Sequence, residues 1–430
     1  MRQGFVFALV LSTALVGRAA LAQESQLDGR KAASRAAPLD PRAALQYGIA
    51  LRRAGHLDAA GQELRRGLGL PGGGGGEMEI LLHFELARTA IDRHDFWGAM
   101  SACRSMSTPP ATPPLASHAC MAEDHLLWRR ASEALVETAA ALANGNPSYE
   151  AKVAEALAFE LQVKDAEAEA SLREAIAWKP EAWEAHVWLG RLLVRTLRHD
   201  DGVAELRRAV ALDPDGPEAA FELARTLPAN PEAVTLLEKA VRERPSYVLA
   251  LLRLAEVNLE LGRLAPAREA ADAAIKLTKS EPSAYVVTGR VSLAEGKPDL
   301  ALSAAEKALH LVPNSARAKL LVADAYAAKG DVDSAVENYQ ATYWLDSSDA
   351  TPLVRASVVC HGAGRDTSAR AFGERVTHDF PQWAPGWVAL GDALAGQKEI
   401  ARARAAYDTA LQATGPIDAE SVRAKLTALR

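Results

Sequence analysis

The chain has 430 residues, of which 49% are hydrophobic, 24% are charged and only 6% are aromatic, and its formal net charge is −6. The excess of acidic residues argues against a general binder of nucleic acid or of anionic membranes. Abundant alanine and leucine, with no segment that alternates apolar and polar residues, predict an all-α fold without strands.

The N-terminal residues have the pattern of a secretory signal peptide. Arg2 precedes an apolar run from Phe5 to Val16, and the small residues Ala20 and Ala22 precede Gln23. This pattern predicts cleavage between Ala22 and Gln23 and export, with the bacterial periplasm as the expected location. The alternative is an uncleaved anchor, which is disfavoured because the apolar run is too short to span about 30 Å of hydrocarbon as a helix. Cleavage would leave 47 Lys and Arg against 55 Asp and Glu, a net charge of −8.

Small residues recur along the chain with a period close to 34 residues. One series lies in the predicted first helix of each unit, at Gly48, Ala87, Ala122, Ala156, Gly190, Ala224, Ala255, Gly289, Ala323, Ser357 and Gly391. The other lies in the predicted second helix, at Ala60, Ala99, Ala134, Ala168, Gly202, Ala233, Ala267, Ala301, Ala335, Ala369 and Ala403. Because two independent positions keep one period, the sequence predicts eleven helical hairpins that stack on their neighbours.

Departures from the period locate two irregular loops. The residues missing between Ala224 and Ala233 place a shortened turn at 227–231, within the sixth unit. A longer first step coincides with Pro71 and the glycine run 72–76, which predicts a flexible insertion after the first unit.

This pattern resembles the tetratricopeptide repeat family. The segment from Trp387 to Gly391 matches its Trp-x-x-Leu-Gly opening, and Ala403, Tyr407 and Ala410 follow at the later spacings. Its closing proline is matched by Pro180, Pro214, Pro245, Pro313 and Pro381. The resemblance covers about residues 41 to 416. It implies a superhelical solenoid of about eleven antiparallel helix hairpins with a C-terminal capping helix.

The chain therefore divides into five expected parts. Residues 1–22 are the signal peptide and 23–40 a flexible segment. Residues 41–148 hold the degenerate units one to three with the Gly-rich and Pro-rich loops, and 149–416 hold the regular units four to eleven. Residues 417–430 are the capping helix, in which Val422, Leu426 and Leu429 alternate with charged residues.

The sequence contains no coherent catalytic or cofactor-binding set. The segment from Gly289 to Lys297 superficially resembles a phosphate-binding loop, but its spacing is wrong and Pro298 follows. Neither a His-Glu-x-x-His nor a Gly-x-Ser-x-Gly motif occurs. We therefore expect neither an enzyme activity nor a cofactor.

Two of the three cysteines lie close together in the sequence, with two histidines. In an oxidising compartment, Cys103 and Cys120 are expected to form a disulfide, which would contribute roughly 3 kcal/mol to stability. Two reduced buried thiols remain an alternative, and so does a zinc site with His118 and His125, although the spacing matches no standard zinc module. Cys360 is expected to be a buried free thiol.

In the family that the chain resembles, the first helices line a concave groove that binds partners. The lysine and asparagine clamp for carboxyl-terminal peptides is absent. The groove residues expected to contact a partner are Arg191, Arg195, Arg225, Arg290, Trp188 and Phe221. Arginine suits carboxylates, so an acidic or extended partner segment is expected there. The open alternative is a solvated groove in which these arginines pair internally with Glu218 and Glu256.

The expected function is that of an exported scaffold for protein–protein interactions in the bacterial cell envelope. By family analogy it would serve a trans-envelope assembly for secretion, polysaccharide export or motility. The alternative is a glycan-binding accessory module, which would need several exposed aromatic platforms. We expect no nucleic-acid partner and no membrane span after signal cleavage, and the sequence does not specify the oligomeric state.

Overall fold

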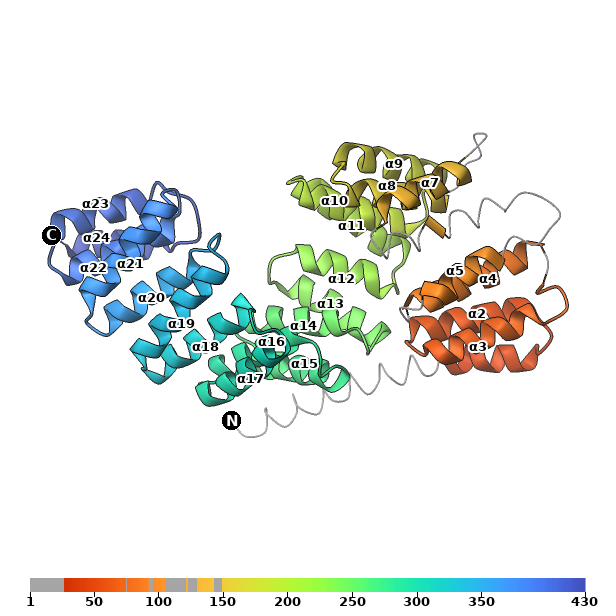
Figure 1. Ribbon diagram of the computed structural model, residues 1–430, viewed down its shortest axis with the longest axis horizontal. Helices are drawn as coiled ribbons and strands as arrows, with labels where there is room; N and C mark the ends of the chain where they lie inside the picture. The colour runs from red at the N-terminus through yellow and green to blue at the C-terminus, as the bar shows by residue number, and fades with distance from the viewer. Residues whose placement is uncertain are drawn as a thin grey trace. The chain divides into compact units, whose positions relative to one another are not determined.

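The computed structural model describes residues 27–74, 76–92, 96–105, 121–122, 130–142 and 149–429. Within them the regular elements are helices, as expected, and one isolated β-bridge joins Trp383 to Thr414 (Figure 1). The chain forms two compact units, which we call the N-terminal unit (Met1–Arg253) and the C-terminal unit (Leu254–Arg430). Each unit is described by itself.

The N-terminal unit begins with a helix over 27–36 and continues as successive helix pairs. In its described residues, the first helices are α2 (Pro41–Arg53), α4 (Gly76–Asp92), α8 (Tyr149–Leu161), α10 (Trp183–Arg195) and α12 (Pro217–Thr226). The second helices are α3 (Leu57–Leu68), α5 (Phe96–Ser105), α7 (Ala131–Ala141), α9 (Asp165–Trp178), α11 (His199–Leu212) and α13 (Pro231–Glu243). Helix α14 (Val248–Glu260) follows, and the boundary between the units falls within it.

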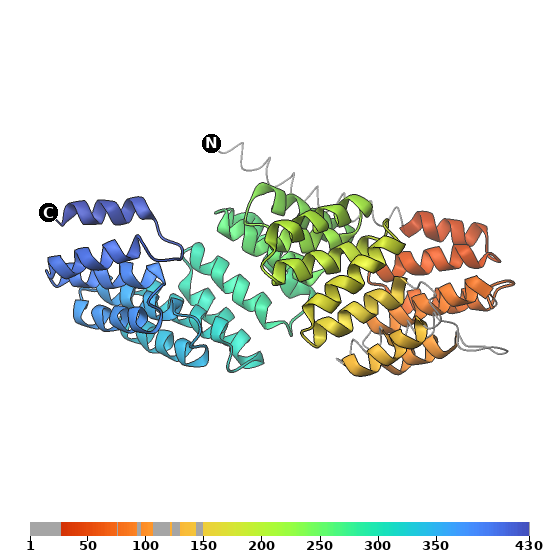
Figure 2. The ribbon, with the colours of Figure 1, turned by 90° about the horizontal axis from the view of Figure 1, so that it is seen from above.

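The C-terminal unit continues the same alternation. Its first helices are α16 (Pro282–Ala294), α18 (Ala316–Lys329), α20 (Thr351–Gly362) and α22 (Ala384–Gly396). Its second helices are α15 (Leu264–Leu277), α17 (Pro298–Leu311), α19 (Val332–Leu345), α21 (Asp366–Asp379) and α23 (Ile400–Ala410), and α24 (Ala419–Ala428) ends the array. Successive helices such as α16 and α17, or α22 and α23, pack against each other, and Figure 2 shows the layered helices of this unit from a second direction. The expected fold of stacked hairpins with a terminal helix is thus confirmed.

The small residues recur at positions where helices pack against one another, because every position of both series is buried. Gly190 on α10 and Gly202 on α11 show the reason. A Cβ atom on Gly190 would lie 2.7 Å from Cγ of Leu206 and 2.9 Å from the carbonyl oxygen of Gly202. The two helices of a hairpin therefore approach so closely that no larger residue fits at these positions.

The shortened turn also lies where the period places it. Helix α12 ends at Thr226 and α13 begins at Pro231. The side chain of Asn230 caps α13 by accepting a hydrogen bond of 2.8 Å from the backbone N–H of Ala233. Pro231 occupies the first turn of the helix, where its missing N–H leaves no bond unmade.

Helix α24 covers the last hairpin. Val422 is buried in a cluster with Leu390, Leu394 and Tyr407. The ammonium group of Lys425 donates to both carboxylate oxygens of Asp392 on α22, at 2.7 Å each. The apolar surface that a further hairpin would cover is thereby shielded from water.

Residues 1–26 lie outside the described part of the chain, and so do Ala22 and Gln23 at the expected cleavage site. Over the residues that the structure describes, none of the helices combines the length and the apolar character that crossing a bilayer requires.

Candidate partner-binding face

The first helices of successive hairpins lie next to one another, and ion pairs join them. Helix α10 contacts α12, and α16 contacts α18. In the C-terminal unit, Arg355 on α20 pairs with Asp324 on α18. Within each unit, we call the surface of its first helices the first-helix face. Arg191, Arg195 and Arg225 lie on this face in the N-terminal unit, and Arg290 lies on it in the C-terminal unit.

Arg191 and Arg225 meet at one carboxylate, that of Glu222, and we call these three residues the Glu222 cluster. Arg225 donates hydrogen bonds of 2.6 and 3.0 Å to Oε2 of Glu222 within α12. Nε of Arg191, on α10, lies 3.8 Å from the same oxygen. The side chain of Glu222 is only 14% exposed, whereas those of Arg191 and Arg225 are 34% and 48% exposed.

The guanidinium group of Arg191 also lies over an aromatic ring. Its central carbon is 4.6 Å from the ring centroid of Trp188. Trp188 is half-buried and packs against the core cluster that contains Leu189 and Leu193. The ring thus fixes the guanidinium plane from beneath and contributes a cation–π contact of about 0.5–1 kcal/mol at such a partly exposed site.

The structure places Phe221 in the core. Its side chain is 5% exposed, and its ring lies 5.0 Å from that of Tyr247. Tyr247 is half-buried, so of these two aromatic rings it is the one that a partner could contact. Burial, together with the nearby carboxylate of Glu218, raises the pKa of Tyr247 well above its usual value. Its hydroxyl is neutral at physiological pH, as that of an ordinary tyrosine is.

The Glu222 cluster holds two cations and one anion. Among the described residues, Arg191 forms an ion pair with Glu222. Its atoms are 3.8 Å apart, which is longer than a hydrogen bond. Donor groups of Arg191 are therefore left for water or for a ligand. Because guanidinium and carboxylate groups form paired hydrogen bonds, the cluster can accept a further carboxylate.

Arg195 differs from Arg191, although both lie on α10. It lies between two acidic residues, with Asp165 at 2.7 Å and Glu160 at 3.6 Å. One cation there faces two anions, so the surroundings of Arg195 carry no excess positive charge. The structure thus brings Arg191 and Arg225 to one carboxylate, whereas Arg195 pairs with two other acidic residues.

Arg290 lies in the C-terminal unit, where it shares a carboxylate with another arginine. Its guanidinium is 3.7 Å from Glu256, and that of Arg317 on α18 is 3.1 Å from the same side chain. Arg317 is 64% exposed and reaches across α16 to α14. The arrangement of two arginines around one glutamate is therefore also present in the C-terminal unit.

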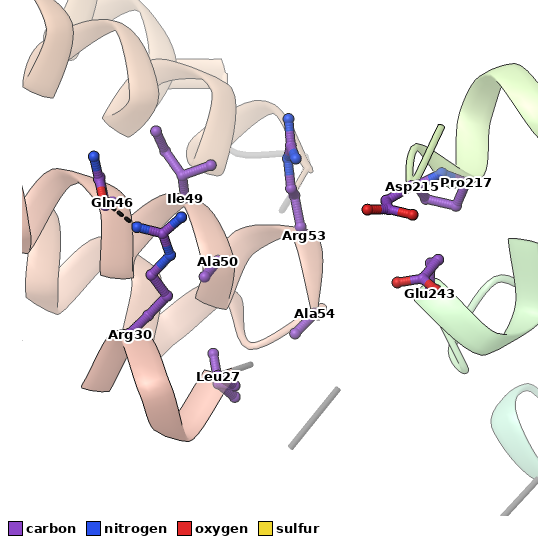
Figure 3. Close-up of a pocket in the computed structure, with 10 residues that line it drawn as sticks. All are labelled: Leu27, Arg30, Gln46, Ile49, Ala50, Arg53, Ala54, Asp215, Pro217 and Glu243. Atoms are coloured by element: carbon purple, nitrogen blue, oxygen red, sulfur yellow. Dashed lines mark hydrogen bonds between the residues drawn. The ribbon is translucent and has the colours of Figure 1, made fainter. Parts of the chain in front are cut away.

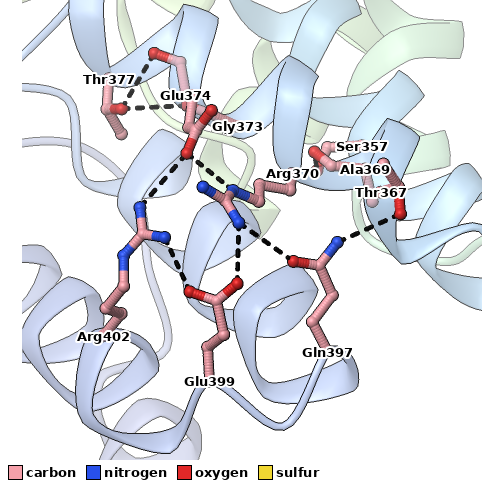
Figure 4. Close-up of polar contacts among 10 residues, drawn as sticks. All are labelled: Ser357, Thr367, Ala369, Arg370, Gly373, Glu374, Thr377, Gln397, Glu399 and Arg402. Carbon is pink, nitrogen blue, oxygen red and sulfur yellow. Dashed lines mark hydrogen bonds and ion pairs between the residues drawn. The ribbon is translucent and has the colours of Figure 1, made fainter.

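A polar network on second helices and loops shows the contrasting arrangement (Figure 4). Arg370 donates to Glu374 at 2.8 Å and to Glu399 at 2.7 Å. Arg402 donates to the same two carboxylates, at 3.3 and 2.7 Å. Two cations and two anions close a balanced ring, which joins α21 to the turn before α23 and leaves no comparable excess of charge.

Sequence reasoning missed three residues of the first-helix face: Glu222, Tyr247 and Arg317. It had offered Glu218 and Glu256 as internal partners of the arginines. Glu256 does pair with Arg290, but Glu218 pairs with Arg244 instead. The spacing of Glu222 and Arg225, three residues apart on one helix, was a usable signal. The pairing of Glu222 with Arg191 depends on helix packing and left no sequence signal.

The cysteines are divided between the described and the remaining residues. Cys103 is buried and disulfide-bonded. Cys120, its expected partner, and His118 and His125 lie outside the described residues, so the pairing of Cys103 with Cys120 stays a prediction. The bonded state of Cys103 does not fit the alternatives of a reduced thiol or a zinc ligand. Cys360 is a buried free thiol, and burial raises its pKa.

Comparisons with known proteins concern the repeat region. A sequence model described as the tetratricopeptide repeat matches residues 166–217, 189–227, 230–282, 287–352 and 361–419. The tetratricopeptide repeat and J domain-containing co-chaperone DNJ1 of Fusarium oxysporum f. sp. lycopersici is 25% identical over 256 residues, 59% of this chain and 44% of that protein. The chain thus matches less than half the length of that relative.

Solved structures of low sequence identity also align with the chain. Yeast Tom70 aligns with 97% of this chain and 95% of its own, at 14% identity and a TM-score of 0.49. A tetratricopeptide repeat protein from Parabacteroides merdae aligns with 65% of this chain and 98% of its own, at 18% identity and a TM-score of 0.45.

Proposed function

Because the chain belongs to the tetratricopeptide repeat family, whose members bind protein partners, we propose that it is an interaction scaffold that holds an acidic segment of a partner at Arg191 and Arg225. The observation that carries the proposal is the composition of the Glu222 cluster. Two guanidinium groups share one carboxylate, and Trp188 holds one of them in place without using its donors.

A partner carboxylate would complete this arrangement. It would accept hydrogen bonds from Arg191, whose place over Trp188 is already set, so little side-chain entropy is lost on binding. Hydrogen bonds to charged groups contribute about 1.5–3 kcal/mol. The lower part of that range applies here because both arginines are partly exposed to solvent, which screens the interaction.

The proposal includes export and a place in the bacterial cell envelope. The signal-peptide pattern that ends at Ala22 and Gln23 supports export to the periplasm. Membership of a secretion, polysaccharide-export or motility assembly rests on analogy with other exported repeat scaffolds.

The glycan-binding alternative has weaker support on this face. Glycan sites use exposed aromatic rings as platforms. Among the described residues, the exposed tryptophans are Trp178 and Trp344, at 38% and 72%, which lie on the second helices α9 and α19. On the first-helix face, Trp188 is half-buried beneath Arg191.

Charge reversal tests the proposal. The double variant Arg191→Glu and Arg225→Glu should abolish recovery of the partner that the tagged wild-type chain captures from its native cells. The matched control is Arg208→Glu with Arg404→Glu, two exposed arginines on the second helices α11 and α23. It makes the same change in net charge and should leave recovery unchanged.

Helical circular dichroism of both double variants should equal that of the wild type, since all four side chains are exposed or half-exposed. Undiminished recovery of the partner by the Arg191 and Arg225 variant would overturn the proposal. So would an equal loss in the control, because that would show a response to net charge alone.

A further inference from the structure

A cavity of about 470 Å³ lies in the N-terminal unit, apart from the Glu222 cluster (Figure 3). One wall comes from the helix over 27–36 and from α2. The other comes from the loop before α12 and from the last residue of α13, which are more than 160 residues further along the chain. The volume falls within the range of about 300–1,000 Å³ typical of small-molecule sites.

The two walls carry opposite charges. Arg30 and Arg53 lie on the first wall, and Asp215 and Glu243 lie on the second. Figure 3 shows both carboxylates on the far side of the cavity from Arg53. Arg30 donates a hydrogen bond to the side chain of Gln46, whereas the described residues offer Arg53 no ion pair. Arg53 is therefore a cation that faces acidic side chains across open space.

The chain segments beside the two walls approach each other at one point. The turn after α2 contains Gly55, whose φ is +82°. A Cβ atom on Gly55 would lie only 3.0 Å from Oγ of Ser246 in the loop before α14. The turn after α2 and the loop before α14 therefore lie close together beside the cavity.

Apolar side chains line the space between the charged groups. Ile49, on α2, and Pro217, at the start of α12, face the cavity. A ligand that suits this lining has an anionic end for Arg53, a cationic end for Asp215 and Glu243, and an apolar body between them. Peptides with free termini have this distribution of charge.

We propose that this cavity binds a short zwitterionic peptide of two to three residues. The peptide carboxylate lies against Arg53, its ammonium group lies between Asp215 and Glu243, and a side chain packs on Ile49. A cavity of 470 Å³ is roughly 8 Å across if its dimensions are similar, and two to three extended residues cover that distance at about 3.3–3.6 Å each. This site does not depend on the partner-binding role of the first-helix face.

The test uses the full chain and isothermal titration calorimetry at low salt. The probes are the tripeptides Ala-X-Ala, with X covering the twenty amino acids and both termini free. At least one of them should bind with a Kd of about 1 mM or tighter. For that peptide, N-acetylation and C-terminal amidation should each weaken binding about tenfold or more, because each removes one of the two charges.

Variants of the walls identify the contacts. Arg53→Gln should weaken binding of the free peptide about tenfold, and C-terminal amidation should then cause little further loss. Glu243→Gln with Asp215→Asn should behave in the same way toward N-acetylation. Arg208→Gln, an exposed arginine on α11 outside the cavity, should bind like the wild type.

The capped peptides test the proposal on the wild-type chain, without any change that could affect folding. No binding of any free tripeptide, or equal binding of free and doubly capped peptides, would overturn the proposal. A full additional loss on amidation in Arg53→Gln would also contradict it, because the carboxylate would then contact another group.

Discussion

In the fourth to eleventh hairpins, except the sixth with its shortened turn, one backbone position between the two helices adopts a left-handed conformation. Gly262, Gly296, Gly330 and Gly364 fill it in four hairpins, with φ between 70° and 78°. Val163, Leu197 and Lys398 fill it elsewhere, with φ of 59°, 64° and 64°. A side chain there costs roughly 1–2 kcal/mol, because its Cβ approaches the following carbonyl oxygen.

Leu197 gives the clearest test of this cost. Its side chain is 92% exposed, so its removal loses almost no packing. We expect Leu197→Gly to raise the free energy of unfolding by about 0.5–1 kcal/mol, because relief of strain exceeds the added entropy of glycine in the unfolded chain. The opposite change, Gly330→Ala, should lower it. Urea denaturation measures both, and a destabilised Leu197→Gly would contradict this explanation.

The contribution of Glu295 to stability should depend on pH. Hydrogen bonds from Arg268 on α15 lower the pKa of Glu295, which follows α16, below its usual value. A lowered pKa in the folded state gives stability that is present above the unfolded pKa of about 4.3 and is lost as pH falls through the folded pKa.

Glu295→Gln should therefore be less stable than the wild type at pH 7, and the difference should shrink as the pH falls from about 5 to below 4. Urea midpoints at pH 7, 5 and 3.5 would show this trend. A difference that stays constant over the whole range would mean that the ionised carboxylate of Glu295 contributes nothing.

The helix pair is the unit of structure, and the close approach of its members is its main constraint. Gly190→Ala should destabilise the chain by about 1–3 kcal/mol, since its new methyl group would meet Leu206 and the backbone of Gly202. Gly362→Ala, at the end of α20, is the matched control. No atom lies within 4 Å of its new Cβ, so the higher helix propensity of alanine should stabilise the chain by about 0.5–1 kcal/mol.

Thermal and urea unfolding of the two glycine variants would give these free energies. Equal effects of both changes would contradict the packing explanation, because only helix propensity would then distinguish glycine from alanine.

The sequence predicted these pairs because their packing rule is local and repeated. A small residue at each of two positions is enough to identify a hairpin. The Glu222 cluster was only half predictable. Arg191 and Arg225 lie at one repeat position, so the period found them, but their shared partner depends on how α10 lies against α12. The register predicted Phe221 as a surface residue, whereas it is buried and packs against Tyr247, from the loop before the next hairpin.

At the scale of the whole molecule, each hairpin packs mainly against its neighbours, so the surface within each unit repeats one contact. A surface of this kind binds through the residues that depart from the repeat. On the described first-helix face, the shared carboxylates Glu222 and Glu256 are such departures, since each lies between two arginines. The cavity beside Arg53 is another, because it joins hairpins that are distant in the sequence.

Site-specific photocrosslinking in native cells tests the central claim most directly. A benzoylphenylalanine residue would replace Trp188 on the first-helix face in one strain and Trp178, at the end of the second helix α9, in another. Both changes exchange one large aromatic side chain for another. The account predicts a partner adduct, identified by mass spectrometry, from position 188 and none from position 178. Adducts from position 178 with none from position 188 would contradict the claim that the first-helix face holds the partner.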